Sequence, residues 1–559
     1  MNNFPRLHCG KLIPLLALFL TYLSSPVLAA TPPNSGAILQ EQTKPQATPK
    51  LAPDIEVGPE QGTAPSENGI KIQVNHIKIT GQNIVAEGEL LPLLSPSFGK
   101  EITFGELETL AGNITKYFHD KGYLVATAFL PQQEIKDGVV EIQVTVGRYG
   151  KIDIHNHSTL KEEIVIALIS SLQKGDYIKK DSLERTLLRL NDTYGISVKA
   201  TLAPSSEKGK SDLILEINDT PKTNGQIIVD NWGNRFTGSN RIGLNLNINN
   251  PSGRGDLLNL GATYAGEGMD NYNFSYTLPV DGKGTKVGGG YSCLNYTLGQ
   301  DFASLHATGV AKTTSLFASF ELARSRKANL TGKIEYATKQ LTDRIDAIPS
   351  ISDKQANIWT ASLSGYSIDQ IAGGGMNSFT LSYLIGNLKL KSADAITNDN
   401  NAHSAGSYSK MNLAVNRLQV INNRLNLYLA FTGQLANKNL DSSEKLQLGG
   451  PTGVRAYPVG ESPGDQGYLF TSELCWNMPT PSFQLAAFYD MGKVTINKNP
   501  WTGSGINNRF LSGAGLGLRW NKTNDFSIRL DYAWKITSDL ATADTDKNGR
   551  LWLQGVKNF

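Results

Sequence analysis

Apolar and polar residues alternate with a period of two through most of the chain after residue 224. Clear examples are residues 242–248, 272–278 and 526–535, where aliphatic or aromatic residues occupy every second position. Successive side chains of a strand point to opposite faces, so this spacing predicts strands with one apolar face. A soluble sandwich and a membrane barrel both contain such strands, because each needs only one apolar face per sheet.

The connections between the predicted strands favour a membrane barrel. Short turns alternate along the chain with longer polar loops, as in outer-membrane barrels. We count sixteen strands between residues 226 and 559, an even number that puts both ends of the barrel on the periplasmic side. The predicted short turns are 250–255, 281–284, 422–423, 479–482 and 521–524, and the predicted long loops are 342–354, 390–407, 438–465, 495–509 and 538–549.

Helical and strand periods alternate in residues 70–219. After a first strand pattern, Thr103 and Glu106 form a capping box at the start of an apolar-faced helix, and two further strand patterns follow. This order predicts a β-α-α-β-β unit over residues 70–148. Residues 149–219 repeat it, which predicts a second copy. An edge strand of such a unit can pair with an extended segment of another chain.

The N-terminal region predicts export. Residues 1–30 combine a basic start, an apolar run too short for a membrane anchor and small residues before the cleavage point, as in a signal peptide. Residues 31–69 are rich in proline, glutamine, glycine and serine, which predicts a flexible linker, and only residues 36–41 are expected to form a short helix, a candidate plug. Beyond the signal only Cys293 and Cys475 remain, and their spacing leaves open whether they pair.

Composition narrows the range of partners. The chain has 559 residues and a formal net charge of +3, which indicates neither nucleic acid nor a strongly acidic partner. Hydrophobic residues make up 40% of the chain without an internal apolar run of about 18 residues, which excludes a helical membrane protein. Aromatic residues near predicted strand ends are expected at the membrane interfaces. They include Trp476, Tyr489, Trp520 and Trp552.

One predicted loop, residues 438–465, has an unusual centre. Its glycines and prolines prevent regular structure, yet it carries a lone cation, Arg455, between Val454 and Tyr457. This pattern predicts a loop that folds back inside the barrel and packs there. An ordinary exposed connection is the alternative.

A carboxylate in a later strand is a candidate partner for this arginine. Phe488, Asp490 and Gly492 are two residues apart, so they share one face of a strand, while the intervening residues suit lipid. Asp490 is therefore expected to face the barrel lumen. There it can accept a charge-assisted, bidentate bond from Arg455, a geometry that lysine would not reproduce.

The repeated unit, the barrel and these two motifs together resemble the TpsB transporters of two-partner secretion, the haemolysin/haemagglutinin secretion-activation family of the BamA-type outer-membrane superfamily. The Val-Arg-Gly-aromatic loop motif of that family matches Val454, Arg455 and Tyr457. Its Phe-x-Asp-x-Gly strand motif matches Phe488, Asp490 and Gly492. The sequence departs from the family at Ala456, where glycine is common, and alanine disfavours a positive φ.

The resemblance implies a mainly β fold: a 16-stranded transmembrane β-barrel over residues 224–559, preceded by POTRA domains over residues 70–148 and 149–219. It implies an outer-membrane transporter that captures an unfolded exoprotein with periplasmic POTRA domains and passes it through the barrel to the surface of a Gram-negative cell. A barrel-assembly factor of the same superfamily is the alternative, and a passive porin or uptake receptor is a weaker one.

The implied partner is a secreted exoprotein with an N-terminal secretion domain, of the adhesin, haemolysin or haem-acquisition type. Outer-membrane lipid and the barrel assembly machinery are also expected to contact the chain. No catalytic residue, cofactor, metal site or nucleic-acid partner is expected, so the chain is not expected to be an enzyme.

Overall fold

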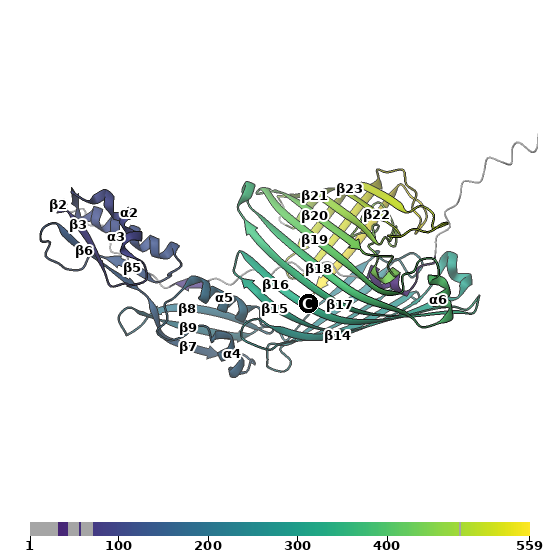
Figure 1. The fold of residues 1–559 in the computed structure, drawn as a ribbon, viewed down its shortest axis with the longest axis horizontal. Coiled ribbons are helices and arrows are strands. Elements are labelled where there is room, and N and C mark those ends of the chain that lie inside the picture. The colour runs from purple at the N-terminus through teal and green to yellow at the C-terminus, as the bar shows by residue number, and fades with distance from the viewer. Residues whose placement is uncertain (1–31, 43–54, 58–70, 480–481) are drawn as a thin grey trace, which may run out of the picture.

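Residues 32–42, 55–57, 71–479 and 482–559 are described by the computed structural model. Two small α/β units lie in line with a closed barrel, and the chain ends on the barrel (Figure 1). The expected signal peptide, residues 1–30, and most of the expected linker lie outside the described residues. No helix within the described ranges is long and apolar enough to cross a membrane.

The first unit contains the predicted capping box. The helix α3 (Phe104–Asp120) begins after Thr103, whose hydroxyl accepts a hydrogen bond from Glu106 N, while the Glu106 carboxylate accepts one from Thr103 N. The apolar face of α3 packs on a three-stranded sheet with the order β3-β6-β5. The other elements are β2 (Lys71–Val74), β3 (His76–Thr80), α2 (Glu87–Leu94), η1 (Ser95–Ser97), β4 (Lys100–Thr103), β5 (Ala126–Phe129) and β6 (Val139–Val146).

The second unit repeats this order, as the sequence predicts. Its elements are β7 (Arg148–Asn156), α4 (Glu162–Ile169), α5 (Lys180–Asn191), β8 (Ile196–Pro204) and β9 (Lys210–Asp219). In the first unit β6 lies between β3 and β5, and in the second unit β9 lies in the same way between β7 and β8. A short strand of the linker, β1 (Ile55–Val57), pairs in parallel with β8 and forms the edge of this sheet, which the sequence did not predict.

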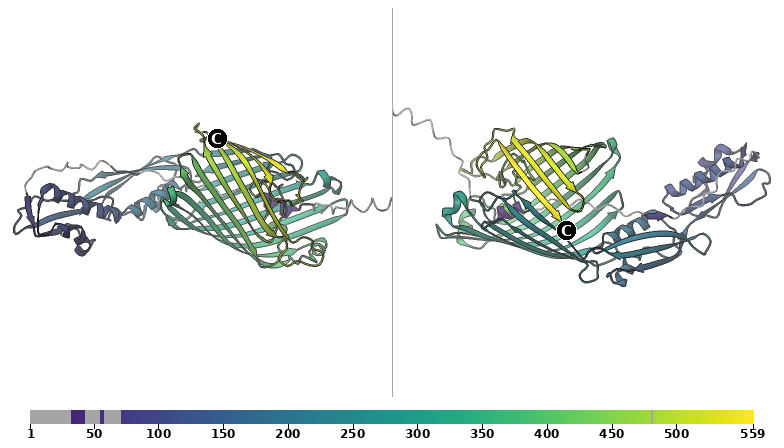
Figure 2. Two further views of the ribbon diagram at one scale, coloured as in Figure 1. Left: turned by 90° about the horizontal axis from the view of Figure 1, so that it is seen from above. Right: turned by 180° about the vertical axis from the view of Figure 1, so that it is seen from behind.

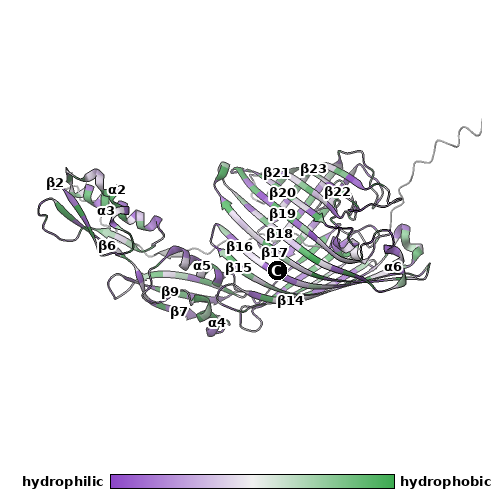
Figure 3. Cartoon of the chain, in the orientation of Figure 1, coloured by the Kyte–Doolittle hydropathy of each residue, from purple (hydrophilic) through white to green (hydrophobic). Residues whose placement is uncertain are grey.

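The barrel has the predicted sixteen strands, all antiparallel to their neighbours, and β10 closes it by pairing with β25. Apolar and polar residues alternate along them (Figure 3), and large apolar side chains such as Tyr272 and Phe274 point outward. The strands are β10 (Thr223–Asp230), β11 (Arg241–Asn249), β12 (Leu257–Tyr264), β13 (Met269–Pro279), β14 (Lys286–Thr297), β15 (Ala307–Arg324), β16 (Ala328–Ile345), β17 (Ser350–Asp369), β18 (Gly375–Leu390), β19 (Gly406–Asn422), β20 (Leu425–Ala436), β21 (Gln466–Asn477), β22 (Phe483–Thr495), β23 (Asn508–Lys522), β24 (Phe526–Lys535) and β25 (Gly549–Asn558).

Strand length is uneven around the barrel. β15 to β19 have 16–20 residues, whereas β10 to β12 have eight or nine. The join between the first and last strands consists of five residue pairs, from Gln226 with Asn558 to Asp230 with Gln554. The joins between the long strands are several times longer.

Two predictions about the barrel were wrong. The expected long loop 342–354 is mostly strand, because β16 and β17 continue to Ile345 and from Ser350; polar residues that face the lumen or solvent look like loop residues in the sequence. Trp552 does not lie at a membrane interface: it is only 6% exposed and points into the barrel, while Leu551 and Leu553 point outward. Trp476, Tyr489 and Trp520 do point outward.

Ion pairs join the second α/β unit to the barrel. Figure 2 shows from two further sides how the units and the barrel are arranged. Arg189 at the end of α5 contacts Glu321 of β15 at 2.8 Å, and Asp192 contacts Arg324 at 2.8 Å. The remaining short helices lie elsewhere: α1 (Ser35–Glu41), η2 (Gln300–Leu305), η3 (Ile371–Gly373), α6 (Ala393–Asp399) and η4 (Ser442–Glu444).

Candidate functional site

The connection between β20 and β21 folds into the barrel. Its centre is buried, including Leu448, Val454 and Tyr457, and these residues form one apolar cluster with Phe488 of β22. The exposed-loop alternative therefore does not describe this connection.

The structure brings Arg455 and Asp490 together. Arg455 Nε donates to Asp490 Oδ2 at 2.8 Å and Nη2 donates to Asp490 Oδ1 at 3.0 Å, which is a bidentate pair. The Arg455 side chain is 2% exposed and that of Asp490 is fully buried. The guanidinium also lies 3.3 Å from the ring centre of Phe488. Two members of the strand motif thus contact the same cation.

Further charges surround this pair. Arg455 Nη1 contacts Glu473 of β21 at 2.7 Å and Asp531 of β24 at 3.3 Å. Arg519 bridges the same two carboxylates, and Arg529 contacts Asp531 at 2.8 Å. Three cations therefore meet three carboxylates, so the buried cluster is neutral as a whole, which limits the cost of burial.

Sequence reasoning missed Glu473, Asp531, Arg519 and Arg529. They lie on three different strands, so motif spacing does not connect them. The sequence does contain a signal for them, because each of the four residues stands at a lumen-facing position of its strand. Charged residues at inward positions of successive strands near an inward loop are candidates for such a cluster.

Backbone contacts also fix the tip of the loop. Trp552 Nε1 donates to the carbonyl oxygen of Arg455 at 2.7 Å, which explains why this tryptophan lies inside the barrel. Tyr457 OH donates to Asp539 O at 2.9 Å, and Tyr457 N donates to Val454 O at 3.0 Å. Ala456 does not have a positive φ, so alanine fits this turn without backbone strain.

Glycines on two strands make room for the tip. A β-carbon at Gly492 would lie 2.8 Å from the Leu448 side chain, which explains the glycine of the strand motif. At Gly513 a β-carbon would lie 2.5 Å from that of Ala456, and at Gly515 it would overlap the Phe488 ring. The glycine-rich β23 thus forms a recess for the loop and its aromatic neighbour.

The base of the loop carries a second set of buried ion pairs. Lys354 of β17 contacts Asp441 at 2.6 Å, and both Lys339 and Lys410 contact Glu444, at 2.6 and 2.9 Å. Burial alone would raise the pKa of Asp441, but Lys354 outweighs burial and lowers it to about 2. The pKa of Glu444 is likewise lowered, because its two lysines outweigh burial.

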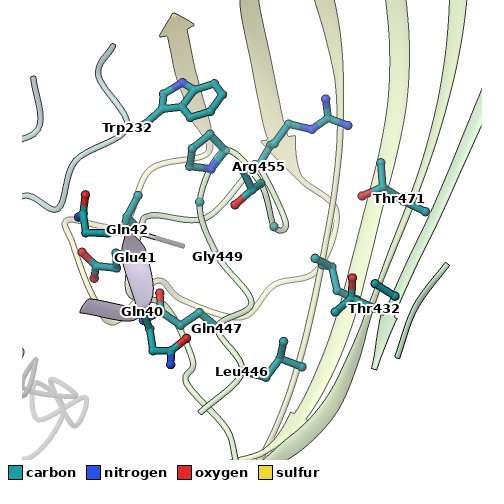
Figure 4. A pocket seen from close by; sticks show the side chains of 18 of the residues that line it. Gln40, Glu41, Gln42, Trp232, Thr432, Leu446, Gln447, Gly449, Arg455 and Thr471 are labelled. Atoms are coloured by element: carbon teal, nitrogen blue, oxygen red, sulfur yellow. The ribbon is translucent and has the colours of Figure 1, made fainter. Parts of the chain in front are cut away.

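The predicted short helix is present as α1, and it lies inside the barrel at the end far from the α/β units (Figures 1 and 2). Ile38 is fully buried in an apolar cluster with Phe236, Met269 and other residues of the barrel. A cavity of about 820 Å³ lies between α1, the loop and the barrel wall (Figure 4). Helix and loop therefore both occupy the lumen.

Cys293 and Cys475 are both free thiols, so the structure contains no bond between them. Cys475 lies in β21 with its Sγ 3.7 Å from Glu473 Oε1.

The chain folds as a closed sixteen-stranded barrel with an inward loop, preceded by two β-α-α-β-β units. The family match and the curated relatives identify its class as outer-membrane polypeptide transporters. Residues 209–520 match the family described as "Haemolysin secretion/activation protein ShlB/FhaC/HecB", and residues 72–147 match "POTRA domain, ShlB-type". The first match covers more than half of the chain, and the chain belongs to this haemolysin secretion/activation family. It is an outer-membrane transporter of two-partner secretion, with its POTRA domains in the periplasm.

Known relatives are similar over nearly the whole chain. The "Heme/hemopexin transporter protein HuxB" of Haemophilus influenzae is 28% identical over 551 residues, 96% of this chain and 97% of the relative. The "Outer membrane transporter CdiB" of Escherichia coli O6:K15:H31 is 22% identical over 526 residues, 90% of this chain and 86% of the relative.

Solved structures support the fold. CdiB from Escherichia coli aligns with a TM-score of 0.68 at 18% identity, covering 89% of this chain and 93% of that chain. BamA from Haemophilus ducreyi lacking POTRA domains 1–3 aligns with a TM-score of 0.54 at 16% identity, covering 87% of this chain and 100% of that chain.

Proposed function

We propose that the buried pair of Arg455 and Asp490 holds loop 438–465 inside the barrel in the resting transporter, and that this contact supports secretion. The observation that carries the proposal is the bidentate geometry at 2.8 and 3.0 Å in a fully buried setting. A cation enclosed by Asp490, Glu473 and Asp531 gives the loop one defined position. The loop and α1 both occupy the lumen, so both leave their positions when an exoprotein passes.

The other motif residues support this position. Val454 and Tyr457 anchor the tip in the apolar cluster, Phe488 stacks against Arg455, and Gly492 leaves space for the loop. In this proposal each motif residue has a packing or charge role at one contact surface. None acts on a substrate chemically.

Capture of the exoprotein is assigned to residues 70–148 and 149–219 as the two POTRA domains, ahead of the barrel of residues 224–559. In the first unit β5 lies at an edge, to which an extended segment can add by main-chain hydrogen bonds, whereas the edge of β8 in the second unit is already paired with the linker strand β1. This mode does not require a folded partner, which suits a chain that crosses the membrane unfolded.

We propose that the exoprotein is of the haem-acquisition type. The support is the similarity to the relative described as a heme/hemopexin transporter, which extends over nearly all of both chains. The test is deletion of this transporter in its own cells, followed by recovery of the exported protein whose surface level falls. Haem binding by that protein is expected, and a haemolytic or adhesive protein without haem binding would refute the assignment.

Insertion of the barrel into outer-membrane lipid is assigned to the barrel assembly machinery.

The loop contact is tested by secretion. Cells that carry Arg455→Ala or Asp490→Ala should export markedly less exoprotein, because either change leaves buried charge without its main partner. Barrel insertion is measured in the same cells by heat-modifiable migration on gels and should be unchanged. Arg424→Ala, in the exposed turn between β19 and β20, is the matched control and should secrete normally. Normal secretion by both Arg455→Ala and Asp490→Ala would refute the proposal.

A further inference from the structure

The α1 helix rests on the base of the inward loop. Ser442 Oγ donates to the side chain of Asn34, the N-cap of α1, at 2.6 Å, and Gln447 Nε2 donates to Ala37 O at 3.1 Å. The side chain of Gln40 donates to Ser443 O. The short helix η4 and the residues after it therefore form the surface on which α1 sits.

The approach between α1 and η4 is very close. A β-carbon at Gly36 would lie 2.5 Å from Ser442 Oγ and 2.7 Å from Ser443 N, closer than non-bonded atoms approach. Only glycine at this position allows the helix to reach η4. The position of α1 thus depends in part on where η4 is held, together with its contacts to the barrel wall, where Ser35 N donates to Asp343 Oδ1 at 2.7 Å and Ile38 is buried.

Buried charge holds η4 in place. Glu444, the last residue of η4, is 2% exposed and contacts Lys339 of β16 and Lys410 of β19. Both ammonium groups also donate to the η4 backbone: Lys339 Nζ to Ser443 O at 3.1 Å and Lys410 Nζ to Glu444 O at 2.7 Å. Ser443 O consequently accepts from the barrel wall and from α1 at once.

This ion cluster is separate from the one at the tip. The tip cluster is formed by β21, β22, β23 and β24, whereas Glu444 is held by β16 and β19. The loop is therefore held at two places on different parts of the barrel wall. Among the described residues, the Glu444 cluster is the one that adjoins η4, on which α1 packs.

We propose that Glu444, held by Lys339 and Lys410, is a positioning residue that keeps α1 seated in the outer mouth of the barrel. Without the carboxylate, two buried ammonium groups lose their counter-charge and η4 loses its fixed position. The inference deepens the proposed function, on which it rests for its consequence in secretion, but the seating of α1 is measurable without any exoprotein.

The test measures how often α1 leaves its seat. Ser35→Cys provides the reporter, because Ser35 is fully buried, its hydroxyl has no hydrogen-bond partner among the described residues, and a thiol is nearly isosteric. Cys293 and Cys475 are replaced by serine in the same chain. The rate of labelling of the purified protein in detergent by a maleimide then reports release of α1.

Glu444→Gln is expected to raise this labelling rate at least tenfold. Glu335→Gln is the matched control: Glu335 pairs with Lys333 on the same strand, β16, but both side chains are about one-third exposed, so its labelling rate should stay within twofold. An unchanged rate in a folded Glu444→Gln barrel, judged by heat-modifiable migration, would overturn the proposal.

Two further variants keep the test decisive. Gly36→Val leaves the ion pairs intact but blocks contact with η4, so it should also raise labelling; no change would show that α1 does not depend on this seat. If Glu444→Gln fails to form a barrel, Lys339→Met decides instead, with a several-fold rise expected and an unchanged rate overturning the proposal. Arg455→Ala changes the contact at the loop tip, so its effect on secretion tests the proposed function and not the position of α1.

Discussion

Replacing Arg455 by lysine separates charge from geometry at the loop tip. The arginine makes four contacts of 2.7–3.3 Å to three carboxylates. A lysine ammonium is a compact donor on a flexible stem and does not reproduce the planar fork that spans Asp490 and reaches Glu473. We expect at least two of the four contacts to be lost while the positive charge is retained.

The magnitude follows from these contacts. Hydrogen bonds to charged groups contribute about 1.5–3 kcal/mol each. Loss of two, partly offset by the retained charge, should destabilise the docked loop by about 2–4 kcal/mol. Since about 1.4 kcal/mol corresponds to a factor of ten, the undocked loop should become roughly 30- to 700-fold more populated.

Trypsin measures this population directly. It cleaves after lysine as well as arginine, so Arg455→Lys keeps the cleavage site while changing the contact. Cleavage requires the buried tip to leave the barrel, and its rate tracks the open population when closing is faster than cleavage. The readout is the appearance of the new N-terminus at residue 456 in purified protein.

The matched control is Arg424→Lys, at an exposed turn, which should leave the rate of cleavage after residue 455 unchanged. An increase of less than threefold for Arg455→Lys would refute the reasoning, because it would mean that the fork geometry adds nothing to a buried positive charge.

Three further predictions concern other contacts. Gly515→Val should speed tryptic cleavage at the loop tip, because its side chain would displace the aromatic ring beneath the arginine; Gly555→Val, whose β-carbon meets nothing within 4 Å, should not. Burial raises the pKa of Glu41 to about 7, so docking of α1 is most stable below pH about 4.5 and weakens as pH rises through 7. The α1 labelling rate, normalised to an exposed cysteine, should rise about tenfold from pH 6 to pH 8, and Glu41→Gln should remove this rise. Glu321→Lys should release the second POTRA domain from the barrel and raise its cleavage by protease, and adding Arg189→Glu should partly restore protection.

The parts of the structure that were predictable are those set by local period and spacing. The sixteen strands follow from alternation, and the inward position of Asp490 follows from parity within one strand. The pairing of Asp490 with Arg455 was predictable from that parity together with the loop motif around Arg455. The capping box of α3 needs only four residues, so its sequence was sufficient.

Contacts between distant elements were not predictable in the same way. Glu444 lies 105 residues from Lys339, and no periodicity links a loop residue to a particular strand. Trp552 was misplaced because aromatic residues near strand ends occur on both faces, and only its register with Leu551 and Leu553 decides which. The three-residue strand β1 is too short for a periodic signal, and its pairing depends on where the linker runs.

The uneven strands have a consequence for the surrounding lipid. At about 3.3 Å per residue and a tilt of about 45°, strands of eight or nine residues rise about 19–21 Å, less than the roughly 30 Å of a hydrocarbon core. The long strands rise about 37–47 Å by the same estimate. Lipid must therefore thin beside β10 to β12, at a cost of fractions of a kcal/mol per Å. This elastic strain in the bilayer acts beside the pairing of β10 with β25, which consists of five residue pairs. Fewer hydrogen bonds oppose separation of the strands there than at the other strand pairings of the barrel.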